Sequence, residues 1–142
     1  MTIAKYIAMA LIVLSSSTPV FAGDNCRPAR AVETPAGSLA ILHCKDKDGH
    51  PLKRVLTLNG KKLLEDSFLS EEDFNKSRTK WVFSGDPVHE TGCPGGLFLV
   101  DMSFVPIRII KFGVRNACNE FHWASWGESD SVIALKNNVQ FK

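Results

Sequence analysis

The stretch PLKRVLTLNGKKLLED, residues 51–66, holds Asn59-Gly60 between two extended runs. Both central positions of a two-residue type I′ turn need a positive φ angle, which asparagine and glycine adopt most readily. The stretch therefore predicts a β-hairpin. Its register puts Leu58 opposite Lys61 beside the turn. Farther out, apolar side chains face apolar ones and basic ones face acidic ones, in the pairs Leu56 with Leu63, Val55 with Leu64, Arg54 with Glu65 and Lys53 with Asp66.

Further extended runs flank this hairpin on both sides. Residues 38–45 (SLAILHCK) form the predicted strand before it. After residue 80 the sequence predicts strands at 81–84, 97–105, 107–115, 121–126, 132–136 and 139–141. In residues 97–105 every second side chain is apolar, which predicts that one face of this strand lies on the core. That face comprises Phe98, Val100, Met102 and Phe104. Strands so close together, with no helix between them, favour an antiparallel meander.

One short helix is expected between these two groups of strands, at about residues 71–78. Ser70 can cap it, acidic residues follow in the first turn, and Leu69 and Phe74 have the spacing of a hydrophobic staple. The sequence thus predicts a mainly β (α+β) fold. We expect a single antiparallel β domain over residues 37–142. It should be a sandwich or a barrel-like fold, contain this one helix and be cross-linked by disulfides.

The N-terminal residues have the pattern of a secretory signal peptide. Lys5 precedes a nine-residue apolar run at 6–14, and Val20-Phe21-Ala22 offers small residues for cleavage after residue 22. A run of this length is too short to span a bilayer, which takes about 20 residues. We therefore expect residues 1–22 to be removed, residues 23–36 to form an extended arm held only at Cys26, and the mature chain to be periplasmic or secreted without a membrane span.

All four cysteines lie beyond the leader, and an even number in an exported chain favours two disulfides. Three pairings are possible. We predict Cys26 with Cys44 and Cys93 with Cys118, because each of these bonds would tie a loop or a terminus to a nearby strand end.

Charge and motifs exclude several functions. The 17 Lys and Arg against 15 Asp and Glu leave a formal charge of +2, too little to predict nucleic-acid binding. The loop at 85–96 (GDPVHETGCPGG) lacks the lysine and hydroxyl residue of a phosphate-binding loop. His89, Glu90 and Cys93 could bind zinc only if Cys93 were reduced. We therefore predict neither a cofactor nor a metal.

The segment FHWASWG, residues 121–127, is the most unusual in composition. Simple alternation along a strand would put Phe121 and Trp123 on one face and His122 and Trp126 on the other. The second face could stack on a sugar or anchor a protein partner, whereas the alternative is that both tryptophans are buried. The candidate binding residues are His122, Trp123 and Trp126, together with His89 and Glu90 of the 85–96 loop.

Three functions remain as hypotheses. The favoured one is an exported, noncatalytic binding protein that recognises another protein in the cell envelope, of the inhibitor or immunity type, because no catalytic set is evident in a small stapled β scaffold. The second is a glycan- or cell-wall-binding module that uses Trp123, Trp126 and Trp81. The third is a small secreted hydrolase built on Cys118 with His122, or on a carboxylate pair drawn from Asp86, Glu90, Asp101 and Glu120.

Overall fold

The computed structural model describes residues 25–88 and 92–142, and the secondary structure of these residues consists of strands. The predicted signal peptide, residues 1–22, lies outside the described residues. The eleven strands are β1 (Asn25–Thr34), β2 (Gly37–Lys45), β3 (Pro51–Leu58), β4 (Lys61–Asp66), β5 (Leu69–Phe74), β6 (Lys80–Pro87), β7 (Pro94–Asp101), β8 (Arg108–Phe112), β9 (Phe121–Trp126), β10 (Ser131–Leu135) and β11 (Gln140–Phe141). No helix in these residues is long and apolar enough to cross a membrane.

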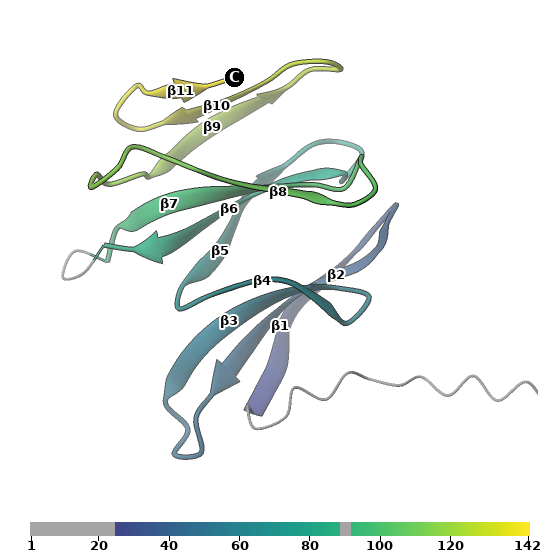
Figure 1. The fold of residues 1–142 in the computed structure, drawn as a ribbon, viewed down its shortest axis with the longest axis vertical. Coiled ribbons are helices and arrows are strands. Elements are labelled where there is room, and N and C mark those ends of the chain that lie inside the picture. The colour runs from purple at the N-terminus through teal and green to yellow at the C-terminus, as the bar shows by residue number, and fades with distance from the viewer. Residues whose placement is uncertain (1–24, 89–91) are drawn as a thin grey trace, which may run out of the picture.

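The strands form three antiparallel meanders stacked as layers (Figure 1). The first sheet has the order β1-β2-β3-β4, the second β5-β6-β7-β8 and the third β11-β10-β9. The second sheet lies between the other two. The prediction of a mainly β, antiparallel fold is therefore confirmed. Of the two predicted architectures, sandwich and barrel, the sandwich is observed, because each sheet keeps free edges and does not close into a barrel.

Two apolar cores hold the layers together, one on each face of the second sheet. Trp81, Phe83 and Val100 pack toward the first sheet, against residues such as Leu56. On the opposite face, Val82 and Leu97 pack against Ile133 and Leu135 of the third sheet. Strands β6 and β7 are apolar on both faces because both of their faces are covered, and each fully buried large side chain contributes about 1.5–3 kcal/mol. This explains why Leu97 is as buried as the predicted core residues Phe98, Val100 and Met102. The prediction is wrong for Phe104, which lies beyond the end of β7 and is exposed.

The predicted helix at 71–78 does not form. Residues 69–74 are strand β5, paired with β6 from Leu69 opposite Gly85 to Phe74 opposite Trp81. As a strand, the segment buries Leu69 and stacks the Phe74 ring on Trp81, with the ring centroids 4.4 Å apart. An isolated helix of eight residues has little stability of its own, so these tertiary contacts outweigh the capping signal.

The hairpin predicted at 51–66 is present, but its register differs from the prediction. Asn59 and Gly60 have φ angles of 50° and 76°, and Leu58 faces Lys61 as expected. A bulge beyond Thr57 then shifts the pairing by one residue, so that the predicted partners are wrong and the observed ones are Leu56 with Leu64, Val55 with Glu65 and Arg54 with Asp66. The bulge lets the two consecutive leucines, Leu63 and Leu64, both contact the core.

The expected N-terminal arm is a full strand of the first sheet. Strand β1 pairs with β2 from Asn25 opposite Lys45 to Thr34 opposite Gly37, so Cys26 is not its only attachment. Arg30 adds an ion pair of 3.2 Å to Glu71 of β5, which links the first two layers. Both predicted disulfides, Cys26–Cys44 and Cys93–Cys118, are confirmed.

Candidate functional site

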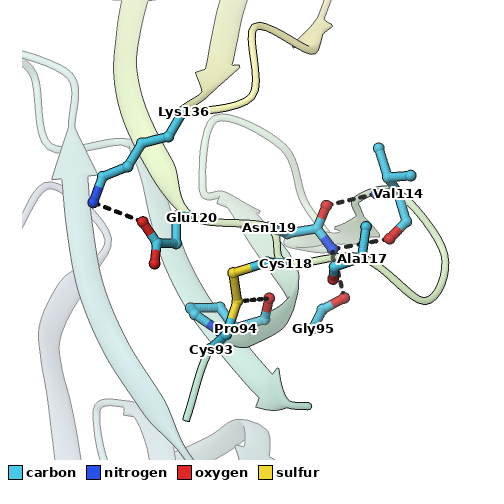
Figure 2. Close-up of a disulfide and its surroundings, with 9 residues drawn as sticks. All are labelled: Cys93, Pro94, Gly95, Val114, Ala117, Cys118, Asn119, Glu120 and Lys136. Atoms are coloured by element: carbon cyan, nitrogen blue, oxygen red, sulfur yellow. Dashed lines mark hydrogen bonds and ion pairs between the residues drawn. A yellow bond between two sulfur atoms is a disulfide. The ribbon is translucent and has the colours of Figure 1, made fainter. Parts of the chain in front are cut away.

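The loop between β8 and β9, residues 113–120, is held near its C-terminal end by the Cys93–Cys118 disulfide and by the side chain of Asn119 (Figure 2). The Asn119 side chain is fully buried, and its Oδ1 accepts a hydrogen bond of 2.6 Å from the backbone N–H of Val114. Its amide nitrogen donates to the carbonyl oxygens of Gly95, at 2.8 Å, and of Val114 and Ala117, both at 3.0 Å. One side chain therefore fixes the shape of the whole loop.

This arrangement removes the cysteine version of the hydrolase hypothesis. A nucleophilic cysteine needs a free thiolate, and Cys118 is bonded to Cys93. The described carboxylates proposed for the alternative hydrolase each have a separate partner: Asp86 binds Lys111 and Glu120 binds Lys136, both at 2.7 Å, whereas Asp101 accepts the N–H of Ser103. Nothing in this arrangement supports a catalytic carboxylate pair.

The aromatic segment of β9 is arranged differently from the prediction. The pairing with β10 shifts between Trp123, opposite Ala134, and Phe121, opposite Leu135, so His122 is an extra residue in the strand. The bulge reverses the alternation beyond it. Trp123 is therefore exposed on the outer face of the third sheet, whereas Trp126 is half-buried against the second core and donates through Nε1 to Asp73 Oδ2 at 3.3 Å. The predicted common face of His122 and Trp126 is wrong.

The other candidate residues have three different outcomes. His122 is exposed near Trp123. His89 and Glu90 lie outside the described residues. Trp81, which the glycan hypothesis included, is completely buried and donates through Nε1 to the carbonyl oxygen of Arg78 at 2.9 Å, so it cannot contact a ligand.

A broad open groove runs beside Trp126 between the second and third sheets. It encloses about 1320 Å³ and lies between the β5–β6 turn, the β7–β8 loop and the β9–β10 turn. Most of its lining side chains carry hydroxyl, amide or charged groups, and Trp126 and Phe104 supply aromatic rings: Asn75, Lys76, Ser77, Thr79, Lys80, Ser103, Phe104, Ala124, Ser125, Trp126, Gly127, Glu128 and Ser129.

The β7–β8 hairpin carries an exposed apolar surface that the sequence analysis missed. Val105, at the tip, is 101% exposed, and Phe104, Ile109 and Ile110 are 41%, 39% and 49% exposed. The guanidinium of Arg108 lies over the Phe104 ring, 3.6 Å from its centroid, and holds the ring in place. We call Phe104, Val105, Ile109 and Ile110 the hairpin surface.

Strand β8 is also the last strand of its sheet, so within the described residues one of its backbone edges has no strand partner. Ile109 lies opposite Val100 and Ile110 opposite Leu99, and the two isoleucines therefore project from opposite faces of this edge. An edge that is unpaired and apolar can pair with another extended chain.

Comparison with protein-family models, curated proteins and solved structures found no match to this chain. Function must therefore be argued from the surfaces themselves. The hairpin surface and the groove meet at Phe104, which belongs to both, but they differ in chemistry: the first is apolar with an open backbone edge, and the second is mostly polar.

Proposed function

We propose that this chain is a noncatalytic binding protein that recognises another protein through the hairpin surface and the edge of β8. The observation that carries the proposal is the complete exposure of Val105 beside a half-exposed phenylalanine, with two exposed isoleucines on the following strand. Four exposed apolar side chains at one tip and along both faces of the adjoining edge strand are a concentration that often marks a binding site. Burying a side chain of this size is worth about 1.5–3 kcal/mol, so a few such residues can anchor a partner.

The proposed mode of binding is addition of an extended partner segment to β8. Backbone hydrogen bonds along the edge would supply affinity, and the isoleucines on the two faces would select the partner's side chains. The hairpin is already ordered, because Val100 and Met102 are buried in the first core and Arg108 holds the Phe104 ring. Little entropy is then lost on binding, which favours affinity.

The compartment is also part of the proposal, and the disulfides support it. Two disulfides and no free cysteine among the described residues are typical of an oxidising environment. Together with the signal-like N-terminal sequence, they support an exported protein in the periplasm or outside the cell. A small stapled scaffold that presents one apolar hairpin there suits an inhibitor or an immunity-type protein.

The test is capture of a partner from envelope and secreted fractions by the oxidised protein and by matched variants. Val105→Asp and Ile110→Asp place a charge on the hairpin surface, and Leu52→Asp places one on an exposed apolar residue of β3, 48% exposed, as the control. We expect one partner to bind the wild type and Leu52→Asp and to be lost from the other two. The same partner on all four proteins, or only abundant background proteins, would refute the proposal.

The groove supports a second function, binding of a glycan. Hydroxyl and amide side chains beside the Trp126 ring are the groups that bind and stack on sugars. Titration of tryptophan fluorescence with soluble cell-wall fragments tests this, with Trp126→Phe as the variant that keeps an aromatic ring in the core. No spectral change with any fragment, and no difference between the variant and the wild type in fragment binding, would remove this candidate.

A further inference from the structure

A separate pocket lies at the open end of the first sheet, away from the β7–β8 hairpin. It encloses about 450 Å³ and is formed by the bulged part of β1, the end of β2 and the turn that follows. Its charged lining side chains are all basic, and no carboxylate lines it: the lining residues are Asn25, Arg27, Pro28, Ala29, His43, Lys45 and Gly49.

The register of the sheet brings these basic groups together. Arg27 lies directly opposite His43 on one side, and Arg54 lies directly opposite His43 on the other. Lys45, two residues along β2 from His43, faces Asn25. A protonated His43 would therefore face a positive charge on each side, and like charges directly opposite each other destabilise a sheet.

Within the described residues, no carboxylate forms an ion pair with the basic residues that line this pocket. None of the ion pairs formed there includes Arg27, His43 or Lys45. The guanidinium of Arg54 donates to the carbonyl oxygen of Leu69 at 2.9 Å and lies over the Phe68 ring. Asp66 faces Arg54 across the β3–β4 pair, but its carboxylate oxygens accept hydrogen bonds from the backbone N–H groups of Phe68 and Asp86.

Two acids, Asp46 and Asp48, lie in the turn beside the pocket, and the Asp46 carboxylate is hydrogen-bonded within that turn. Asp46 Oδ1 accepts hydrogen bonds of 2.9 Å from the backbone N–H groups of Asp48 and His50, and Oδ2 lies 3.4 Å from the His50 ring. Burial and the neighbouring positive charges both act on the pKa of His43. It is lowered from its ordinary value by partial burial first, and then by the positive charges of Arg54 and Lys45.

We propose that this pocket binds a small oxyanion of the phosphate class. Arg27 offers a planar fork of N–H donors, Lys45 an ammonium group, and Asn25 an amide donor, which are the groups that bind phosphate oxygens. His43 completes the set as a donor when protonated. The inference is independent of the proposed function, because the pocket is on the first sheet and the hairpin surface is on the second.

The experiment follows the His43 imidazole by NMR in the oxidised protein while inorganic phosphate is added. A bound anion stabilises the imidazolium ion, so we expect a saturable change and a rise in the pKa of His43 that sodium chloride at equal ionic strength does not produce. Arg27→Gln and Lys45→Gln should each weaken the apparent phosphate affinity about threefold to tenfold. Lys61→Gln, at the exposed first residue of β4 beside the Asn59-Gly60 turn, is the matched control and should leave the phosphate affinity unchanged.

Equal shifts with phosphate and chloride would mean that salt only screens the basic residues, and the proposal would fail. It would also fail if Arg27→Gln bound phosphate as well as Lys61→Gln does. A parallel titration with glycerol phosphate distinguishes the two sources of the same chemistry. Tighter binding of the ester supports a phosphate carried on a larger molecule, and tighter binding of inorganic phosphate supports the free ion.

Discussion

Replacement of Asn119 by alanine should be among the most destabilising single changes outside the apolar cores. The side chain is completely buried and forms hydrogen bonds with the backbone of three residues: it accepts one from the N–H of Val114 and donates to the carbonyl oxygens of Gly95, Val114 and Ala117 (Figure 2). Alanine removes all of them and leaves a small cavity.

The magnitude follows from the number of bonds. Each neutral hydrogen bond contributes about 0.5–1.5 kcal/mol net, and a buried group left without a partner costs about 1–3 kcal/mol. Val114 is partly exposed, so water can replace part of what it loses, whereas the less exposed Gly95 has less access to water. We therefore expect Asn119→Ala to lower the free energy of unfolding by about 2–3 kcal/mol, a large share of the 5–15 kcal/mol that is typical of a whole domain.

Equilibrium unfolding in guanidinium chloride, with both disulfides intact, measures this loss. The control is Asn137→Ala, which removes an exposed asparagine with one hydrogen bond, from the N–H of Val139 to Oδ1 at 3.2 Å. Asn119→Asp tests the polarity of the site, because it keeps the shape but replaces the donating NH2 group by an oxygen that faces carbonyl oxygens. If Asn119→Ala cost no more than Asn137→Ala, or if Asn119→Asp were as stable as the wild type at neutral pH, the role assigned to Asn119 would be wrong.

Three further predictions concern stability. Burial raises the pKa of Glu71 above its ordinary value of 4.5, so the folded state keeps this proton to a higher pH than the unfolded state does. The contribution of Glu71 to the free energy of unfolding should therefore fall as pH rises from about 4.5 through the raised pKa. Denaturation at a series of pH values should show this decrease in the wild type and not in Glu71→Gln. Trp81→Phe keeps an aromatic ring but loses the N–H bond to the Arg78 carbonyl and leaves a cavity, and should lower the melting temperature with a loss of about 1–3 kcal/mol. Replacing Cys26 and Cys44 together by serine opens a loop with a sequence separation of 18 and should cost about 3 kcal/mol in chemical denaturation; an unchanged midpoint would contradict the assumption that this bond restrains the unfolded chain.

Local chemistry was enough to predict turns, most strands and the two disulfides. Asn59 and Gly60 form the expected turn because their preference for positive φ depends on these two residues alone. The pairing beyond the turn depends on how Leu63 and Leu64 both reach a core made by another sheet, and the hairpin sequence does not contain that information. The same cause makes residues 69–74 a strand despite a capping signal, since Trp81 and the rest of β6 select the extended form.

The candidate site was harder to predict because exposure depends on the order of strands in a sheet. The sequences of β7 and β8 are similarly rich in apolar residues, yet β7 is inside the second sheet and β8 is at its edge. The predicted faces of β9 are wrong for a different reason. His122 is an extra, bulged residue, so each side chain after it points to the opposite face from the one predicted. Neither the strand order nor the bulge has a signature in the residues concerned.

Because β8 is an edge strand, the residues of the hairpin surface do not support the binding proposal equally. A sheet covered on both faces needs apolar residues on both faces of its strands, and the edge strand lies where that cover ends. The exposure of Ile109 and Ile110 is partly a consequence of this architecture. Val105 has no such reason to be apolar, because it stands at the tip, beyond both cores, and is fully exposed. If the hairpin surface is a binding site, Val105→Asp should abolish capture of the partner while leaving the unfolding midpoint unchanged. If Ile110→Asp lost binding only to the extent that it lost stability, Ile110 would be needed for the packing of the sheet and not for contact with the partner.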